Sequence, residues 1–251
     1  MALPSDAFAA AAALEAVPSA LAAARDGIDA CLRNSGFPDS ARRGSGGSRR
    51  STPDRTGESL LRGAAASAAL DGSGSSLDDI RSGRADAIGA AAVRLNVELL
   101  SLLQVWRTVP LQALARMHSL AAAADDAGRG RPRADAEAVA RVADLARRLC
   151  AQTSAPALAV AALVHAELMT ARPFASRNGL VARAAERLVL VSRGVDPASL
   201  MVPEAGHRAL ADAYVGALAG YADGGRDGVR AWLLHCATAY VSGARAIPGI
   251  E

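Results

Sequence analysis

The sequence predicts an all-α fold, and three observations support this. Half of the 251 residues are apolar, chiefly alanine, leucine and valine, whereas aromatic residues make up only 3%. Runs of β-branched residues are short, and apolar residues recur at helical spacing. A chain of this length can build one sizeable core. We therefore expect one main domain of helices that pack closely through small side chains.

The N-terminal part has helical patterning followed by a polar stretch. Residues 7–33 carry the helical pattern, with Pro18 as a break. Residues 34–57 are rich in Gly, Ser, Pro and Arg and cannot bury much apolar surface. The predicted organisation is an N-terminal helical segment (1–33), a flexible linker (34–57) and a helical domain (58–245).

Four helices are expected in the first half of that domain. The first ends where Gly72 can take the left-handed conformation that closes a helix. A loop follows, with a short turn at residues 76–82. The second helix is amphipathic, with Leu95, Leu99 and Trp106 on or near one face. The expected helices span residues 59–72, 85–107, 111–123 and 134–151.

The next helix, which ends near Ala171, is apolar on almost every side and should therefore be central and buried. His165 and Glu167 on this helix point in different directions, so we expect His165 to be a core histidine. Two further helices are expected at residues 204–221 and 227–242.

A short loop, residues 172–178, joins the central helix to a helix that opens at Gly179. Pro173 lacks a backbone N–H and disfavours helical geometry in the residue before it, so the first helix stops there. Asn178 is expected to cap the second helix with its side chain. A donor-rich loop that leads into a helix N-terminus is a natural site for a phosphate or a carboxylate.

Composition excludes several classes of function. All 28 basic residues are arginine, they are scattered, and the net charge is only +3, so nucleic-acid binding is not expected. Cys31, Cys150 and Cys236 lie far apart, without the spacing of a metal or redox motif. We find no signal peptide, and we expect that no apolar run reaches the length of a membrane span, which predicts a cytoplasmic protein.

The stretch RPFASRNGLVAR resembles the signature of the Fic/Doc (Fido) family, His-x-Phe-x-Asp/Glu-Gly-Asn-Gly-Arg-x-x-Arg. Four positions match the signature: Phe174, Asn178, Gly179 and Arg183. Four differ: Arg172 at the histidine, Ser176 at the metal-binding acid, Arg177 at the first glycine and Leu180 at the first arginine. The resemblance implies a nucleotide or phosphate site formed by Arg172, Phe174, Ser176, Arg177, Asn178, Gly179 and Arg183.

The stretch SAALDG resembles the family's inhibitory helix, Ser/Thr-x-x-x-Glu-Gly/Asn, through Ser67, Asp71 and Gly72. In the family, the glutamate is thought to pair with the last arginine of the signature and to obstruct the γ-phosphate. The resemblance therefore implies that Asp71 lies about 2.7 to 3.2 Å from Arg183. The alternative interpretation is an ordinary helix end closed by Asp-Gly.

Other parts of the chain are similar to the family in order and spacing. His118 lies on a helix like the one that precedes the family's target-docking hairpin, although a structural role for this histidine is expected. A basic loop with Arg129, Arg131 and Arg133 stands where that hairpin would be, so the hairpin is expected to be reduced or absent. Trp232 corresponds to a buried tryptophan of the last helix.

The substitutions in the signature predict a loss of family chemistry. Family members transfer AMP from ATP with the histidine as general base and Mg²⁺ on the acid. Arg172 has no acceptor lone pair, and Ser176 offers no carboxylate. We expect a catalytically silent domain that binds ATP, another nucleotide or phosphate ligand, or a protein partner, without Mg²⁺. The alternatives are a nucleotidyl- or phospho-transferase with altered chemistry, and a helical interaction module without a ligand. Either a monomer or a homodimer fits the sequence.

Overall fold

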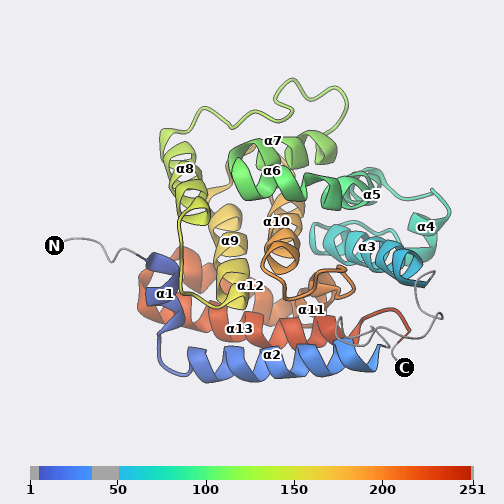
Figure 1. Ribbon diagram of the computed structural model, residues 1–251. Helices are drawn as coiled ribbons and strands as arrows, with labels where there is room; N and C mark the ends of the chain where they lie inside the picture. The colour runs from blue at the N-terminus through green and yellow to red at the C-terminus, as the bar shows by residue number, and fades with distance from the viewer. Residues whose placement is uncertain (1–5, 36–50, 250–251) are drawn as a thin grey trace.

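The computed structural model describes residues 6–35 and 51–249, and these residues form helices without any strand. The all-α prediction is confirmed. In chain order the elements are α1 (Ala7–Ala12), α2 (Val17–Asn34), α3 (Ser51–Leu70), α4 (Leu77–Arg81), α5 (Ala87–Leu99), the 3₁₀ turn η1 (Leu100–Leu102), α6 (Leu103–Thr108), α7 (Pro110–Ala121), α8 (Ala136–Cys150), α9 (Ala157–Ala171), α10 (Asn178–Ser192), α11 (Pro203–Ala209), α12 (Ala211–Ala222) and α13 (Gly225–Arg245) (Figure 1).

Helices α9 and α10 lie side by side at the centre of the molecule (Figure 1). Helix α9 buries residues on every side, among them Ala159, Ala162 and Ala166. These alanines let neighbouring helices approach closely, since they add little volume between the helix axes. The predicted central helix is confirmed, and His165 on it is fully buried.

The other helices enclose this central pair. Helix α13 runs beneath α9, with α2 along its outer side, and α3 lies beside α5 and α11 (Figure 1). The indole of Trp232 on α13 is fully buried and donates to the carbonyl oxygen of Ala162 at 2.7 Å. This bond fixes α13 against α9, because a buried N–H must find an acceptor.

The N-terminal helices belong to the same core as the rest of the chain. Val17, Leu21 and Ile28 of α2 are buried in it. The carboxylate of Asp6 caps α1 and accepts hydrogen bonds from Thr153 and Ser154, which precede α9. The sequence assigned residues 1–33 to an N-terminal helical segment and left the packing of this segment open. In the structure, its described part packs in the same core as the other helices.

The predicted linker, residues 34–57, differs from the structure at its C-terminal end. Residues 36–50 lie outside the described residues, but α3 begins at Ser51 and not near residue 59. Pro53 in the first turn is compatible with a helix, because the first N–H groups have no helical partner. Arg55 donates to the carbonyl oxygens of Ser35 and Pro248, so the polar composition here serves contacts between chain segments.

Two predicted helices are interrupted in the structure. The helix expected at residues 85–107 contains the 3₁₀ turn η1, and the one expected at residues 204–221 divides into α11 and α12. The first of these segments, Ala87–Thr108, is long and apolar enough by composition to cross a membrane. Our expectation that no run reaches that length is therefore wrong. In the fold this segment packs against α3, α7 and α10.

We predict that Ile28→Ala lowers the free energy of unfolding by about 2 to 4 kcal/mol, because it leaves a cavity between α2 and the rest of the core. Chemical denaturation of the full chain measures this. Val215→Ala is the control, since Val215 is 65% exposed and its truncation should cost under about 0.5 kcal/mol. Equal effects of the two substitutions would mean that α2 is not part of the core.

Candidate functional site

The loop between α9 and α10 has an unusual backbone. Arg172 and Arg177 have φ values of +46° and +57°, in the left-handed region. A residue with a side chain pays about 1 kcal/mol or more to adopt this conformation, and such strain gathers at functional sites. Arg177 stands where the signature has its first glycine. The loop therefore keeps a backbone suited to glycine although the glycine is absent.

Asn178 closes this loop and does not cap the helix as predicted. Its side-chain oxygen accepts from the backbone N–H of Phe174 at 3.0 Å, and its side-chain nitrogen donates to the Phe174 carbonyl at 2.8 Å. Helix α10 has Arg177 at its N-cap, without a side-chain cap. Because Asn178 is already the first helical residue, its amide reaches back across the loop.

Phe174 is a packing residue under the loop. Its ring is buried and stacks on the imidazole of His118, with the ring centres 4.2 Å apart. The Nδ1 atom of His118 accepts from the backbone N–H of Gly130 at 3.0 Å. Burial lowers the pKa of His118. These contacts agree with the structural role that we expected for His118.

The arginine at the end of the signature, Arg183, is only 1% exposed, and protein groups occupy most of its donors. Its Nε donates to the Ser67 hydroxyl at 2.8 Å, its Nη1 to the Tyr214 hydroxyl at 3.2 Å, and its Nη2 to the Ser67 carbonyl at 3.0 Å. Burial opposes the charged form, but Tyr214 and Asp71 outweigh it and hold the pKa of Arg183 above its usual value.

Asp71 lies 2.5 Å from the same guanidinium, so the contact expected between these two side chains is present. The carboxylate also lies over Gly179 at the start of α10. A Cβ atom at residue 179 would overlap the Asp71 oxygen and lie 2.9 Å from Arg183 Nη2. The approach of Asp71 therefore requires glycine there. A carboxylate occupies a position where the positive end of the helix dipole favours an anion.

Only some of the residues predicted to form the phosphate site lie close together in the structure. Gly179 and Arg183 meet Ser67 and Asp71, and Gly72 ends α3 with a φ of +90°. The side chain of Arg172 is exposed, while Ser176 and Arg177 are partly exposed. Among the described residues, neither arginine side chain is in an ion pair. Phe174 and Asn178 instead build the loop.

Two arginines of the loop at residues 122–135 donate side-chain hydrogen bonds to carbonyl groups. Arg129 donates to the Ser119 carbonyl at the end of α7. Arg133 donates to the Arg172 carbonyl at 2.7 Å, and its backbone N–H donates to Pro173. Cationic side chains suit helix C-termini, where free carbonyls collect. Residues 122–135 thereby hold the signature loop in place, and no strand occurs among them.

A second polar cluster, which sequence reasoning missed, lies in the core below Arg183. It consists of His165, Glu186 and His207, and all three side chains are fully buried. His165 Nδ1 and His207 Nε2 lie 3.0 and 3.1 Å from Glu186 Oε2. We expected His165 to be a core histidine, and it is. Glu186 and His207 stand in amphipathic stretches whose polar residues look solvated, so only the fold reveals the cluster.

The charge states in this cluster follow from burial and from its members. Burial alone would raise the pKa of Glu186, but the two histidines outweigh it and hold that pKa well below its usual value. Burial lowers the pKa of His165. Tyr240 donates to Glu186 Oε1 at 2.7 Å, and burial raises the pKa of this phenol. The two histidines therefore favour the charged form of the buried Glu186 carboxylate.

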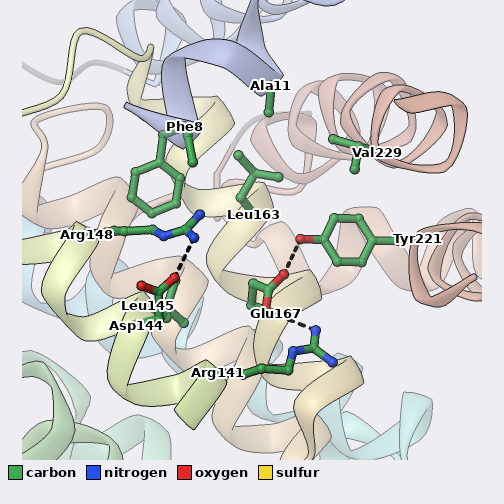
Figure 2. Close-up of a pocket in the computed structure, with 11 residues that line it drawn as sticks. Phe8, Ala11, Arg141, Asp144, Leu145, Arg148, Leu163, Glu167, Tyr221 and Val229 are labelled. Carbon is green, nitrogen blue, oxygen red and sulfur yellow. Dashed lines mark hydrogen bonds and ion pairs between the residues drawn. The ribbon is translucent and has the colours of Figure 1, made fainter. Parts of the chain in front are cut away.

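Two of the cavities among the described residues bear on function, and both lie away from this cluster. One, of about 370 Å³, opens between α1, α8, α9 and α12 (Figure 2). Glu167 lines this cavity and accepts hydrogen bonds from Tyr221 at 2.6 Å and from Arg141 at 3.0 Å. The charge of Glu167 is therefore already paired within the protein. The other is an apolar groove of about 460 Å³ beside the signature loop. Its lining includes Val109, Leu111, Val139, Pro173 and Phe174.

Comparison with known proteins identifies the fold. A Fic family protein from Desulfovibrio desulfuricans G20 has a TM-score of 0.73 and 20% identity, over 90% of this chain and 73% of that one. Fic-1 from C. elegans gives a TM-score of 0.69 and 15% identity, over 92% and 72%. A variant of Fic-1 gives 0.67 and 16%, over 91% and 71%. No protein-family model and no curated protein sequence matches the chain. The chain thus has the fold of Fic family proteins.

We predict that Asn178→Ala lowers the free energy of unfolding by about 1 to 3 kcal/mol, because it leaves the buried N–H and carbonyl of Phe174 unpaired. Ser176→Ala in the same loop is the matched control and should cost under about 0.5 kcal/mol. Urea denaturation followed by circular dichroism measures both. Equal stabilities of Asn178→Ala and the wild type would contradict the loop-closing role.

Proposed function

We propose that this chain is a catalytically silent member of the Fic/Doc family. In this proposal, the N-terminus of α10 binds a nucleotide or another phosphate-bearing ligand only when Asp71 withdraws. The observation that supports it most strongly is the position of the Asp71 carboxylate, 2.5 Å from Arg183 and in contact with Gly179. We infer that a carboxylate paired with a guanidinium beside a helix N-terminus stands where a phosphate oxygen would bind.

The loss of catalysis follows from the residues at the two key positions of the signature loop. Arg172 stands where the resemblance requires a general base, and a guanidinium remains protonated. Ser176 stands where the resemblance requires a carboxylate for Mg²⁺, which usually binds through at least one acid. Loss of a general base alone costs about 10²- to 10⁴-fold in rate. The proposed ligand, ATP or a related nucleotide, therefore binds without Mg²⁺ and is not turned over.

The arginines at the loop give the ligand a second point of contact. Arg172 and Arg177 keep their side chains at least partly in solvent, on the backbone that leads into α10. A ligand with several phosphate groups would interact with these two arginines as well as with Arg183. Inorganic phosphate should then bind more weakly than a nucleoside triphosphate.

A protein partner is the second candidate, and the apolar groove beside the loop favours it. Val109, Leu111 and Val139 line this groove and are 48%, 45% and 44% exposed. In the family, the hairpin near this face holds the target protein, whereas here residues 122–135 form a loop. Apolar side chains left open beside a functional loop are typical of a docking surface.

We predict that the purified chain transfers no AMP. Incubation with ATP, Mg²⁺ and a cell lysate, followed by mass spectrometry, should detect no modified protein. Arg172→His should also be inactive, because Ser176 and Leu180 still lack the carboxylate and the guanidinium of the family signature. ATP-dependent labelling by the wild type would overturn the proposal and support altered chemistry in the same pocket.

We predict that Asp71→Ala raises the affinity for ATP, since it vacates the position of the carboxylate. In the wild type, ATP must first break the charge-assisted hydrogen bond of Asp71, which is worth about 1.5 to 3 kcal/mol. Removal of this bond should therefore raise the affinity for ATP roughly tenfold to 100-fold. Without ligand, the same change should lower stability by about 1 to 3 kcal/mol, because Arg183 loses a partner. Calorimetric titration with ATP measures the first effect, and urea denaturation measures the second.

Asp227→Ala is the control for this experiment, because the Asp227 side chain is fully exposed and lies on α13. It should change neither stability nor ATP affinity. If neither the wild type nor Asp71→Ala binds ATP or inorganic phosphate, the chain is not a phosphate-binding domain, and the groove remains as the functional surface.

A further inference from the structure

We propose that His165, Glu186 and His207 form a structural binding site for a divalent transition-metal ion, with zinc as the preferred ion. This inference is independent of the phosphate site, because it concerns the core below Arg183. The three side chains come from α9, α10 and α11, so an ion held by them would join three helices at the centre of the fold.

The ligand atoms have the spacing that one ion requires. One atom from each side chain can be chosen such that all lie within 4.8 Å of one another. His165 Nδ1 and His207 Nε2 each lie about 3 Å from Glu186 Oε2, at 3.0 and 3.1 Å. Ligand atoms around a tetrahedral zinc ion, bound at about 2.0 to 2.2 Å, stand roughly 3.3 Å apart. Small side-chain adjustments would accommodate the ion.

His165 Nδ1 is a buried atom whose contact is otherwise unexplained. It is 3.0 Å from the Glu186 carboxylate, yet the geometry does not make a hydrogen bond, and no other atom of the described residues bonds to it. Most buried polar atoms are hydrogen-bonded, so an exception requires a reason. Two ligand atoms of one ion lie close together without bonding to each other. A shared ion would therefore account for the contact between His165 Nδ1 and the Glu186 carboxylate.

The outer nitrogens of both histidines have partners that fix the ring orientations. His165 Nε2 lies 2.9 Å from the Tyr214 hydroxyl, and His207 Nδ1 lies 3.2 Å from His235 Nε2. His207 Nε2 also lies 3.1 Å from both Glu186 oxygens and donates a hydrogen bond to them. A bound ion would replace this bond, with the outer nitrogens as donors and the lone pairs of both inner nitrogens directed at the ion. Supporting hydrogen bonds of this kind are typical of metal-binding histidines.

The donor set selects the class of metal. Two imidazoles and a carboxylate suit zinc and similar transition ions, whereas Mg²⁺ and Ca²⁺ prefer oxygen ligands. All three side chains are fully buried, so the ion would have a structural role. His235 beside His207 is only partly buried and gives the cluster its nearest approach to solvent among these histidines.

The test uses the full chain, treated with a chelator, dialysed and titrated with Zn²⁺ alone. Calorimetry and elemental analysis should find one ion per chain with a micromolar or lower Kd, and Tm should rise on binding. Titration with Co²⁺ should give visible absorption of a nitrogen–oxygen site without a thiolate charge-transfer band. A thiolate band would assign the ion to cysteine and overturn the proposal.

Glu186→Gln keeps the size of the side chain and removes the carboxylate, so zinc affinity should fall at least tenfold. His118→Gln is the matched control, because His118 is also buried but lies outside the cluster and should leave zinc binding unchanged. If Glu186→Gln fails to fold, X-ray absorption of the wild-type zinc complex decides, and two imidazoles in the first shell are expected. The proposal is wrong if the wild type binds no stoichiometric zinc, or if folded Glu186→Gln binds zinc as tightly as the wild type. Either result would mean that the three side chains form an ordinary hydrogen-bonded cluster.

Discussion

The buried guanidinium of Arg183 is the constraint on which the arrangement around α10 depends. An unpaired charge in the core would cost several kcal/mol, so hydrogen-bond partners for this guanidinium must be supplied by the fold or by a bound anion. They are supplied by Ser67 and Asp71 at the end of α3 and by Tyr214 on α12. Three helices are therefore fixed relative to one another by one side chain, and the loop before α10 is fixed with them.

Helix α10 continues this pattern along its length. One turn beyond Arg183 lies Glu186, bonded to Tyr240 and in contact with two histidines, and next to it Arg187 pairs with Glu204 at 2.6 and 2.9 Å. A Cβ atom at Gly63 would lie 2.6 Å from Arg187, so α3 can pass over this ion pair only with glycine there. The charges of α10 thus determine which helices may lie beside it and how closely.

The fold class, the central helix and the contact of Asp71 with Arg183 could be predicted from the sequence. The first two rest on local patterns, the composition and an apolar stretch. The contact was implied by the resemblance of two short motifs to those of the Fic/Doc family. The start of α3 could not, because the fold stabilises residues 51–57 through remote contacts such as Arg55 with Pro248. The cluster around Glu186 could not be predicted from the sequence either. An amphipathic pattern places charged residues in solvent, and only tertiary partners reveal that those of α10 are buried.

A double-mutant cycle between Asp71 and Arg183 tests most directly whether this contact organises the site. The unfolding free energies of the wild type, Asp71→Ala, Arg183→Met and the double variant give the coupling energy. A charge-assisted hydrogen bond to a buried guanidinium predicts a coupling of about 1.5 to 3 kcal/mol. A coupling energy within about 0.5 kcal/mol of zero would mean that Asp71 does not hold Arg183, and the account of a closed anion site would be contradicted.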